Sequence, residues 1–526
     1  ITWEVRSTAT AGNLNGGGFK TGASGTNHSL QDTAHLSITD LQSDGSGVVH
    51  SDLTPFDTSD IGNILHITAV GTGFTVGWYE VTAVDGSTPP NATLDRSPGL
   101  SKTGGTAYLG GALSLNSTLD TDWGIVPVAG NKIYIKQGSY TIGEAMSPND
   151  GSKGSPIIIR GYKTTRDEVC TGNDRPLINL SSYTFTLGGY SRLENVRFFG
   201  TGSVYLDTAS SIIYNCQVLS TGSSYAIRLI AGTTALYCEA SSPRLEGIQS
   251  GSGVVIGCYV HHCLKGIRGT TAINVYNCVV THCNTSAIAL ESTNNKIVGC
   301  TLIGASTPIG VGIDIAANYG NTVVNNIIYG FVTGLSCTAA DYTSFIDNNN
   351  FFNNTTDATN LTLSPSNIFT DPALTNPEGT LIEDCEDAWN EYVDADVTST
   401  AEGTTKLIGS YSAKADCAIG LGAGDIIMTE VIASTDMSTW KGVGFLFRSS
   451  VTLTAGDVQL LVSDQANCAN ILEAYDIPTI AANTWYWFYW RFADSSDMTA
   501  IISIGLKQVV DKGAMSLYID DVRGVN

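Results

Sequence analysis

The chain has 526 residues, of which only 14% are charged and 57 are glycine, and its formal net charge is −23. This composition is typical of all-β proteins that act outside cells or on virions, rather than of cytosolic enzymes. The acidic excess argues against nucleic acid and against an anionic membrane surface as partners, because both need basic patches. No segment approaches the roughly 18 apolar residues of a membrane span. Ile1–Val5 already looks like a strand, so we expect no secretion signal in this sequence.

Residues 1–125 contain strands and loops without a clear period. Trp78–Val84 alternates apolar and polar side chains as a strand does. Gly16–Gly18 and Pro89-Pro90 mark loops between such strands. We expect this region to be β-rich and to serve for attachment and for capping of the domain that follows it.

Short apolar strands recur between about residue 126 and residue 370, beginning with Lys132–Lys136. Equivalent points in this region are marked by Cys216, Cys238, Cys258, Cys278 and Cys300, at steps of 22, 20, 20 and 22 residues. A second strand in each repeat carries an apolar residue that we expect to face inward, namely Ile227, Ile248, Ile267, Ile288, Ile313 and Leu335. A fixed period in short β-rich phrases indicates stacked coils of strands. The pattern predicts a parallel β-helix over residues 126–370.

Several polar residues also repeat in these coils. Asn195, Asn215, Asn277 and Asn326 align directly before the inward position, which predicts a ladder of left-handed turns. The repeated cysteines are expected to be reduced and buried, as small apolar side chains, which indicates assembly in a cytoplasm. His262 and His282 each precede a cysteine of a second row. Two histidines and two cysteines suit a metal ion in number, but parallel rows do not converge, so stacked imidazoles are the favoured interpretation.

Residues 379–526 have longer, alternating strands, such as Gly442–Arg448 and Trp485–Phe492. Residues 371–378 separate them from the coils. Long alternating strands joined by turns are typical of antiparallel β-sandwiches. The sequence therefore predicts an all-β protein with a β-helix followed by a β-sandwich.

Three resemblances extend this interpretation. Lys132-Ile-Tyr-Ile-Lys with Pro156-Ile-Ile-Ile-Arg-Gly resembles the opening of pectate-lyase-like right-handed β-helices. Thr2-Trp-Glu-Val-Arg with Asn15-Gly-Gly-Gly-Phe resembles β-helical structural proteins of tailed bacteriophages. Glu383-Asp-Cys-Glu-Asp-Ala-Trp resembles jelly-roll domains of the carbohydrate-binding-module type. The resemblances imply a right-handed helix and a virion context, but a fold does not define an activity.

One row of outward-facing side chains on the predicted β-helix is a candidate site for binding or catalysis. It carries Arg228, Arg268 and Asp314, and two arginines can hold an anionic sugar. Lyases of the fold that the chain resembles typically combine calcium-binding aspartates with a basic residue, and glycoside hydrolases need two carboxyl groups roughly 5–9.5 Å apart. This row has only one carboxylate, because Glu246 and Glu291 fall off it. An ordinary solvated face is therefore the competing interpretation.

The C-terminal domain has two further candidates. Jelly-roll modules of the type it resembles often carry a structural calcium ion, for which the acids at its two ends are candidates: Glu383, Asp384, Glu386, Asp520 and Asp521. Surface charge is the alternative for these acids. The segment Trp485–Trp490 places three aromatic side chains on each face of one strand. If one face is core, the set Trp485, Trp487 and Tyr489 is free to stack on sugar rings or to form a protein interface.

The leading hypothesis is a non-enzymatic structural protein of a phage virion, either a capsid decoration or a tail fibre or spike component, that contacts host-surface glycans. Its expected partners are other virion proteins and cell-surface polysaccharide, with homotrimers common among the phage proteins it resembles. Its expected location is the virion surface, and no cofactor other than calcium is predicted. The alternatives are a tailspike-type polysaccharide depolymerase, a lyase or glycoside hydrolase using Asp314, Arg268 and Arg228, and a secreted bacterial adhesin.

Overall fold

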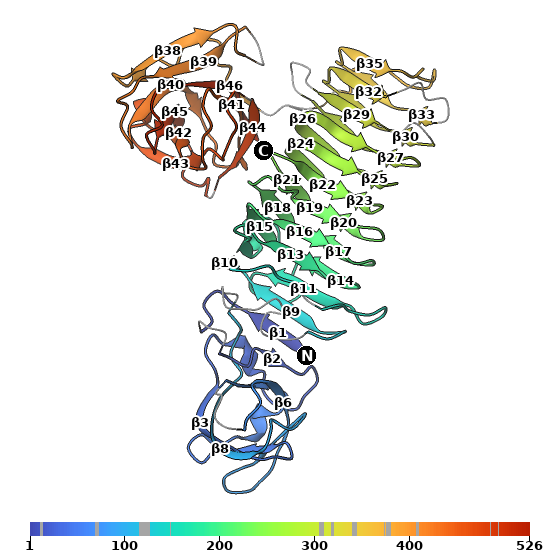
Figure 1. Ribbon diagram of the computed structural model, residues 1–526, viewed down its shortest axis with the longest axis vertical. Coiled ribbons are helices and arrows are strands. Elements are labelled where there is room, and N and C mark those ends of the chain that lie inside the picture. Colours follow the sequence, from blue (N-terminus) through green and yellow to red (C-terminus); the bar gives the residue numbers. More distant parts are fainter. Residues whose placement is uncertain are drawn as a thin grey trace. The chain divides into compact units, whose positions relative to one another are not determined.

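The computed structural model (Figure 1) describes the whole chain except residues 11–13, 69–72, 115–126, 148, 305–309, 317–319, 339–343, 373, 375–379, 407–409, 484, 493 and 526, and except the side chains of Trp487, Tyr489 and Val525. About half of the chain is strand, and the described part contains no α-helix. Its helical segments there are three-residue 3₁₀ turns, which are too short to cross a membrane. By its internal contacts the chain forms two compact units, one of residues 1–220, 225–240 and 250–258, the other of residues 221–224, 241–249 and 259–526.

The central part of the chain is a β-helix built from two sheets (Figure 1). The first sheet has twelve strands. In hydrogen-bonded order they are β2 (Gly18–Phe19), β1 (Thr2–Val5), β9 (Lys132–Lys136), β11 (Ile157–Tyr162), β14 (Ser191–Glu194), β17 (Ile212–Tyr214), β20 (Thr234–Leu236), β23 (Val254–Ile256), β25 (Asn274–Tyr276), β27 (Lys296–Val298), β30 (Thr322–Val324) and β33 (Phe345–Asp347). Parallel pairing puts one buried apolar residue of each coil above the next, for example Ile159, Leu193 and Ile213. This repeated register is the physical origin of the period in the sequence.

The second helix sheet has seventeen strands, because most coils contribute two. They are β10 (Ser139–Thr141), β12 (Leu177–Asn179), β13 (Thr184–Leu187), β15 (Arg197–Gly200), β16 (Ser203–Leu206), β18 (Gln217–Ser220), β19 (Ile227–Leu229), β21 (Glu239–Ser241), β22 (Glu246–Ser250), β24 (Tyr259–Gly269), β26 (Val279–Leu290), β28 (Thr301–Ile303), β29 (Val311–Ile315), β31 (Ile327–Tyr329), β32 (Thr333–Cys337), β34 (Asn350–Phe352) and β35 (Thr356–Thr359). The six apolar residues expected to face inward here are all fully buried. The two sheets form a right-handed β-helix of about ten turns, which confirms the predicted fold class.

A left-handed turn precedes each of the five repeated cysteines. The turn residues Asn215, Tyr237, Gly257, Asn277 and Gly299 have φ between 48° and 69°. Asparagine and glycine enter this region at the lowest cost, which explains their recurrence. After the turn, each cysteine Sγ donates to the carbonyl oxygen two residues earlier, at 3.3 to 3.6 Å. All twelve cysteines are free and buried, as expected, and burial raises the pKa of the Cys216 thiol.

The cysteine row continues as asparagine in the later coils. The prediction that Asn326 occupies the turn row is wrong, because Asn325 holds the left-handed turn (φ 58°) and Asn326 is buried at the inward position. Asn326 Nδ2 donates to Asn349 Oδ1 at 2.9 Å, and Asn349 Nδ2 donates to Asn367 Oδ1 at 3.1 Å. The doublet Asn325-Asn326 allows two alignments in the sequence, and the backbone torsion angles decide between them.

The N-terminal region contains a closed antiparallel barrel of β3 (Leu36–Asp44), β4 (Val48–His50), β7 (Ala92–Leu94), β6 (Gly77–Val84), β5 (Ile64–Ile67) and β8 (Ser101–Leu109). Closure removes free strand edges, which otherwise invite pairing with other chains. Two 3₁₀ turns, η1 (His28–Leu30) and η2 (Thr58–Asp60), lie in its connections. The remaining 3₁₀ turns are η3 (Gly172–Asp174) in the helix and η4 (Ala466–Cys468) in the C-terminal domain.

Strand β1 does not belong to this barrel, because it pairs in parallel with β9 of the helix. The pairing buries the carboxylate of Glu4, which accepts hydrogen bonds from Arg6 Nε at 2.9 Å, from Arg166 Nη2 at 2.7 Å and from the Tyr162 hydroxyl. A buried carboxylate held by two guanidinium groups is compensated rather than costly. The N-terminal strand thus covers the first coil through charge as well as backbone pairing.

The C-terminal domain is an antiparallel β-sandwich with one apolar core, in agreement with the expected fold class. One sheet comprises β38 (Val397–Glu402), β39 (Ser412–Cys417), β46 (Met515–Val525), β41 (Gly442–Ser449) and β44 (Tyr486–Arg491), with β36 (Thr380–Glu383) beside β46. The other comprises β37 (Tyr392–Val393), β40 (Ile426–Thr435), β45 (Ile501–Gln508), β42 (Val458–Ser463) and β43 (Ile471–Asp476).

Candidate functional site

Five charged side chains gather on the second helix sheet. They are Glu246 of β22, Lys265 and Arg268 of β24, Glu291 directly after β26, and Asp314 of β29, and we call them the Arg268 cluster. Strand register places Arg268 opposite Ala289, and Ala289 opposite Asp314. Arg268 and Asp314 therefore lie two steps apart in one row, about 10 Å between their backbones.

The guanidinium of Arg268 holds two carboxylates at once. Its Nε and Nη2 donate to the two oxygens of Glu291 at 2.8 and 2.9 Å, which is a bidentate pair. Its Nη1 donates to Glu246 Oε1 at 3.1 Å. Lys265 Nζ lies 3.8 Å from Glu291 Oε1. Glu246, Lys265, Arg268 and Glu291 thus form a connected ion-pair network, and Asp314 interacts with Lys265 and Glu291 through charge alone.

The pKa values of Asp314 and Glu291 are shifted in opposite directions. Burial raises the pKa of Asp314, Lys265 opposes this shift and Glu291 adds to it. Hydrogen bonds from Arg268 lower the pKa of Glu291. Carboxyl pairs whose environments separate their pKa values can divide the roles of acid and base.

Sequence reasoning missed the two glutamates as members of this site. It placed them off the row, whereas both contact Arg268. For Glu291 a signal was available, because it lies two residues after Ala289 and side chains two apart share one face of a strand. For Glu246 the spacing in the sequence offers no such signal, and only the structure shows its contact with Arg268.

Arg228 has a different environment. It lies on β19 in the first compact unit, its guanidinium carbon is 5.3 Å from the centre of the Tyr205 ring, and strand register places the two residues opposite each other. Arg268 and Asp314 belong to the second unit. The structure therefore brings Arg268 and Asp314 into one cluster, and Arg228 packs on an aromatic ring of its own unit.

The charge balance of the Arg268 cluster restricts its ligands. Lys265 and Arg268 face three carboxyl groups, so the cluster has no positive excess. An anionic saccharide needs uncompensated cationic donors, and Arg268 already has all of its contacts to carboxylates. The expectation that arginines here hold an anionic sugar is thus disfavoured, and neutral hydroxyl groups are the better match.

Acids also gather in the β-sandwich. Glu383, Asp520 and Asp521 all act on the buried Cys385 and raise its pKa further after burial itself. The carboxylate of Asp521 accepts from Arg523 Nε at 2.7 Å, so this acid has a cationic partner. Glu386 points elsewhere, because both of its oxygens accept from Ser410 N.

Asp387, Glu391 and Glu430 also belong to this group. Burial raises the pKa of Glu430 to about 8, and repulsion from Glu391, Glu383 and Asp387 adds to the shift. An all-oxygen, acidic donor set matches calcium chemically. However, in the described part of the chain no three of these acids bring their oxygens within 4.8 Å of one another, so a calcium ion would have to draw them together.

The aromatic strand β44 has one face in the sandwich core. Phe488 and Trp490 are buried, and Tyr486 packs against them. Trp485, on the alternate face, is part-buried and packs edge-on to Tyr518 at 6.2 Å. The predicted ligand or interface residues Trp487 and Tyr489 lie outside the described side chains. His262 and His282 stack in parallel at 4.9 Å, as the favoured interpretation of that row predicts.

These features define an all-β protein with a right-handed parallel β-helix and a C-terminal antiparallel β-sandwich. Residues 202–371 match the family model of the right handed beta helix region. No curated protein matches the sequence.

Among solved structures, the helix part is similar to a mannuronic acid specific polysaccharide family 6 lyase from human gut microbiota, at 15% identity and TM-score 0.34, over 45% of this chain and 71% of the other. The Dettilon tailspike protein is similar at 13% identity and TM-score 0.29, over 74% and 88%. A family 11 carbohydrate-binding module of Clostridium thermocellum is similar at 13% identity and TM-score 0.22, over 28% and 96%. At these identities none of them defines an activity for this chain.

Proposed function

We propose that this chain is a structural protein of a virion surface that binds a neutral host-surface glycan at the Arg268 cluster without cleaving it. We infer the absence of cleavage from one observation: the guanidinium of Arg268 donates hydrogen bonds to both Glu246 and Glu291. A carboxylate held in a bidentate pair is a poor proton acceptor, because protonation would break the pair. Glu291 is therefore a poor base for cleavage, and Glu246 is held by Arg268 through Oε1, while its buried Oε2 has no hydrogen-bond partner.

Binding of a neutral sugar is compatible with the same geometry. The cluster presents planar donors and acceptors side by side on a surface whose backbone is fixed by coil-to-coil pairing. Hydroxyl groups of a sugar both donate and accept, so they can pair with guanidinium and carboxylate edges without a change in net charge. The acidic character of the whole chain likewise disfavours polyanionic glycans.

Binding and cleavage assays on the same polysaccharides test this proposal. Purified protein is applied to an array of neutral and acidic bacterial surface glycans, and bound glycans are then assayed for new reducing ends. We expect binding to a neutral glycan, a loss of at least tenfold in affinity for Arg268→Ala, and no reducing ends. Arg244→Ala is the matched control, since Arg244 is an arginine of the same helix outside the described contacts of the cluster. Preferred binding to acidic glycans would contradict the charge argument.

Glycoside hydrolysis is the second candidate, favoured by the opposite pKa shifts of Asp314 and Glu291. In that case Asp314 is the proton donor and Glu291 the base, and the substrate is a neutral glycan. Release of reducing ends that disappears in Asp314→Asn would establish this candidate and overturn the non-catalytic role. Conversely, the binding role is supported if the parent and Asp314→Asn both bind the glycan and neither releases reducing ends.

The virion role requires other virion proteins and cell-surface polysaccharide as partners, and it places the chain on the particle surface. Mass spectrometry of purified particles tests whether the chain is on the virion, and native mass determination tests whether it forms a homotrimer. A chain found only as a free secreted protein would instead favour the bacterial adhesin.

A further inference from the structure

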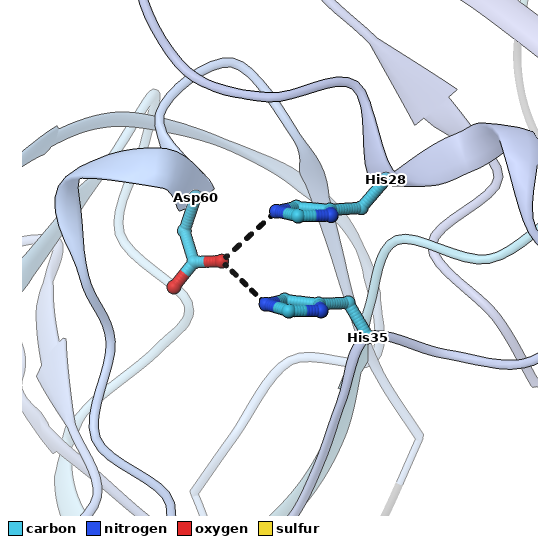
Figure 2. Close-up of side chains that lie close together, drawn as sticks. All are labelled: His28, His35 and Asp60. Atoms are coloured by element: carbon cyan, nitrogen blue, oxygen red, sulfur yellow. Dashed lines mark ion pairs between the residues drawn. The ribbon is translucent and has the colours of Figure 1, made fainter.

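Three side chains of the N-terminal region meet at one point, although their loops are far apart in sequence. His28 begins η1, His35 directly precedes β3, and Asp60 ends η2 (Figure 2). Their ligand atoms all lie within 4.8 Å of one another, and they form the one such group in the described part of the chain. The group lies wholly in the first compact unit and plays no part in the proposed glycan site.

Asp60 supplies the observation that points to a ligand. Its side chain is 1% exposed, and Oδ2 accepts a hydrogen bond from Asp57 N at 2.9 Å. Its other oxygen, Oδ1, has no hydrogen-bond partner. Oδ1 lies 3.6 Å from His35 Nε2 and 3.9 Å from His28 Nε2, beyond hydrogen-bond distance from either (Figure 2). A buried carboxylate oxygen without a donor is rare in native proteins and calls for an explanation.

The backbone around the three side chains is held in place. Asn63 is fully buried, its Oδ1 accepts from His28 N at 2.8 Å and its Nδ2 donates to Thr26 O at 2.7 Å. His35 N donates to Leu109 O at 2.8 Å, which ties it to barrel strand β8. Asp60 closes a capping box with Asp57. Each of the three residues is thus held by its own backbone contacts, while the two imidazole rings stack on each other and His28 Nε2 lies 3.4 Å from Ser59 Oγ.

We propose that His28, His35 and Asp60 bind a divalent transition-metal ion, with zinc as the expected ion. Two imidazole nitrogens and one carboxylate oxygen form a three-ligand set that zinc commonly accepts, whereas calcium prefers oxygen alone. Zinc bonds of about 2.0–2.1 Å in a tetrahedron place neighbouring ligand atoms about 3.4 Å apart. The observed 3.6 and 3.9 Å are a few tenths of an ångström longer, so the ligands need only close slightly.

The two histidines also have to tilt. Their rings are stacked in parallel, with centroids 3.7 Å apart and 3° between the planes, and both Nε2 atoms face Asp60 (Figure 2). An ion in the plane of both rings requires the rings to splay at their far ends. His35 has room for this motion, because its side chain is 33% exposed, and the same opening admits the ion and a water as fourth ligand.

A bound ion would join η1, η2 and the start of β3. These segments are separated in the chain, and their link through this site would close long loops on the outside of the barrel. The metal is therefore structural, and it stabilises the N-terminal region without contributing to glycan recognition.

The test is zinc binding by the full-length, tag-free protein after removal of metals with a chelator. Isothermal titration with zinc chloride, followed by elemental analysis after gel filtration, should give one ion per chain. Cobalt substitution should give the visible absorption of a tetrahedral site. His35→Ala and Asp60→Asn should each weaken binding by at least tenfold. His50→Ala is the matched control, since His50 is a histidine of the same barrel that is not in the cluster, and it should bind as the parent does.

Circular dichroism checks that the variants fold, and His35 is the safer of the two positions because its side chain is partly exposed. A parent protein that retains no zinc overturns the proposal. Binding that persists unchanged in folded His35→Ala also overturns it, because the ion must then lie elsewhere.

Discussion

The asparagine ladder of the helix and the acid group of the sandwich each bring polar side chains of one kind together, and only the ladder supplies its own hydrogen-bond partners. Asn326, Asn349 and Asn367 pass hydrogen bonds from coil to coil, because an amide carries both a donor and an acceptor. Glu383, Glu391 and Glu430 carry acceptors alone when ionised, and Glu391 and Glu383 raise the pKa of Glu430. Stacking of like residues therefore suits neutral, self-complementary groups, whereas stacked carboxylates need a proton or a cation.

Among the variants that test this comparison, Asn349→Asp is expected to have the largest effect. Asn349 Nδ2 donates to Val323 O at 2.8 Å and to Asn367 Oδ1, and a carboxylate would face both acceptors without a donor. An uncompensated buried charge of this kind costs about 3–5 kcal/mol of unfolding free energy. The variant should recover stability at acid pH, where the carboxyl is protonated. Urea unfolding of the variant at pH 4 and pH 8 measures both effects.

Asn348→Asp is the matched control for this substitution. Asn348 is the preceding residue, is exposed and holds the left-handed turn, which aspartate tolerates. It should change the free energy of unfolding by less than about 1 kcal/mol. Equal losses in the two variants would show that the ladder contributes nothing specific.

Glu430→Gln tests the acid group. The pKa of Glu430 is about 8 in the folded protein and 4.5 in the reference state, so the folded state favours the protonated form. The stability of the sandwich should be full below pH 4.5 and should fall as the pH rises towards 8. The variant should therefore unfold at a higher temperature than the parent at pH 8 and at the same temperature at pH 4. Glu402→Gln should instead unfold at a lower temperature than the parent at pH 8, because hydrogen bonds from Thr404 lower the pKa of Glu402 and so stabilise the ionised form.

Calcium provides a second way to satisfy the acids. If the group binds the structural ion that the resemblance to jelly-roll modules implies, calcium should raise the unfolding temperature at pH 8 and have a smaller effect at pH 4, where Glu430 is protonated. Differential scanning calorimetry with calcium, magnesium or chelator measures this. Identical thermograms in all three at pH 8 would exclude a calcium site there.

The smallest effect is expected for Cys300→Asn, which extends the amide ladder by one coil. Cys300 N already donates to Asn326 Oδ1 at 2.8 Å, so a new amide at residue 300 would find the acceptor that the ladder uses in later coils. The two side chains are similar in volume, and we expect a change within about 1 kcal/mol. Cys300→Asp should be as harmful as Asn349→Asp. A harmful Cys300→Asn would mean that the row requires an apolar side chain in that coil.

The sequence predicted the helix well because parallel coils repeat one environment. The cysteines recur at 20 to 22 residues, and the same spacing places them on the same side of successive coils. The sandwich was predictable for a related reason, since alternation in β41 and β44 reports which face is core. The site was predictable only in part. Arg268 and Asp314 share a row that the period reveals, whereas no spacing in the sequence indicates the contact between Glu246 and Arg268.

By itself, the sequence determined the all-β class, the coiling of the central region and the inward rows, because each depends on local spacing. Only the tertiary structure decided that the N-terminal strands close into a barrel, that Glu4 is buried between Arg6 and Arg166, and that His28, His35 and Asp60 meet. These groups join residues that are far apart in the chain and do not repeat. No period or motif records such contacts, since they depend on where the backbone returns after a loop.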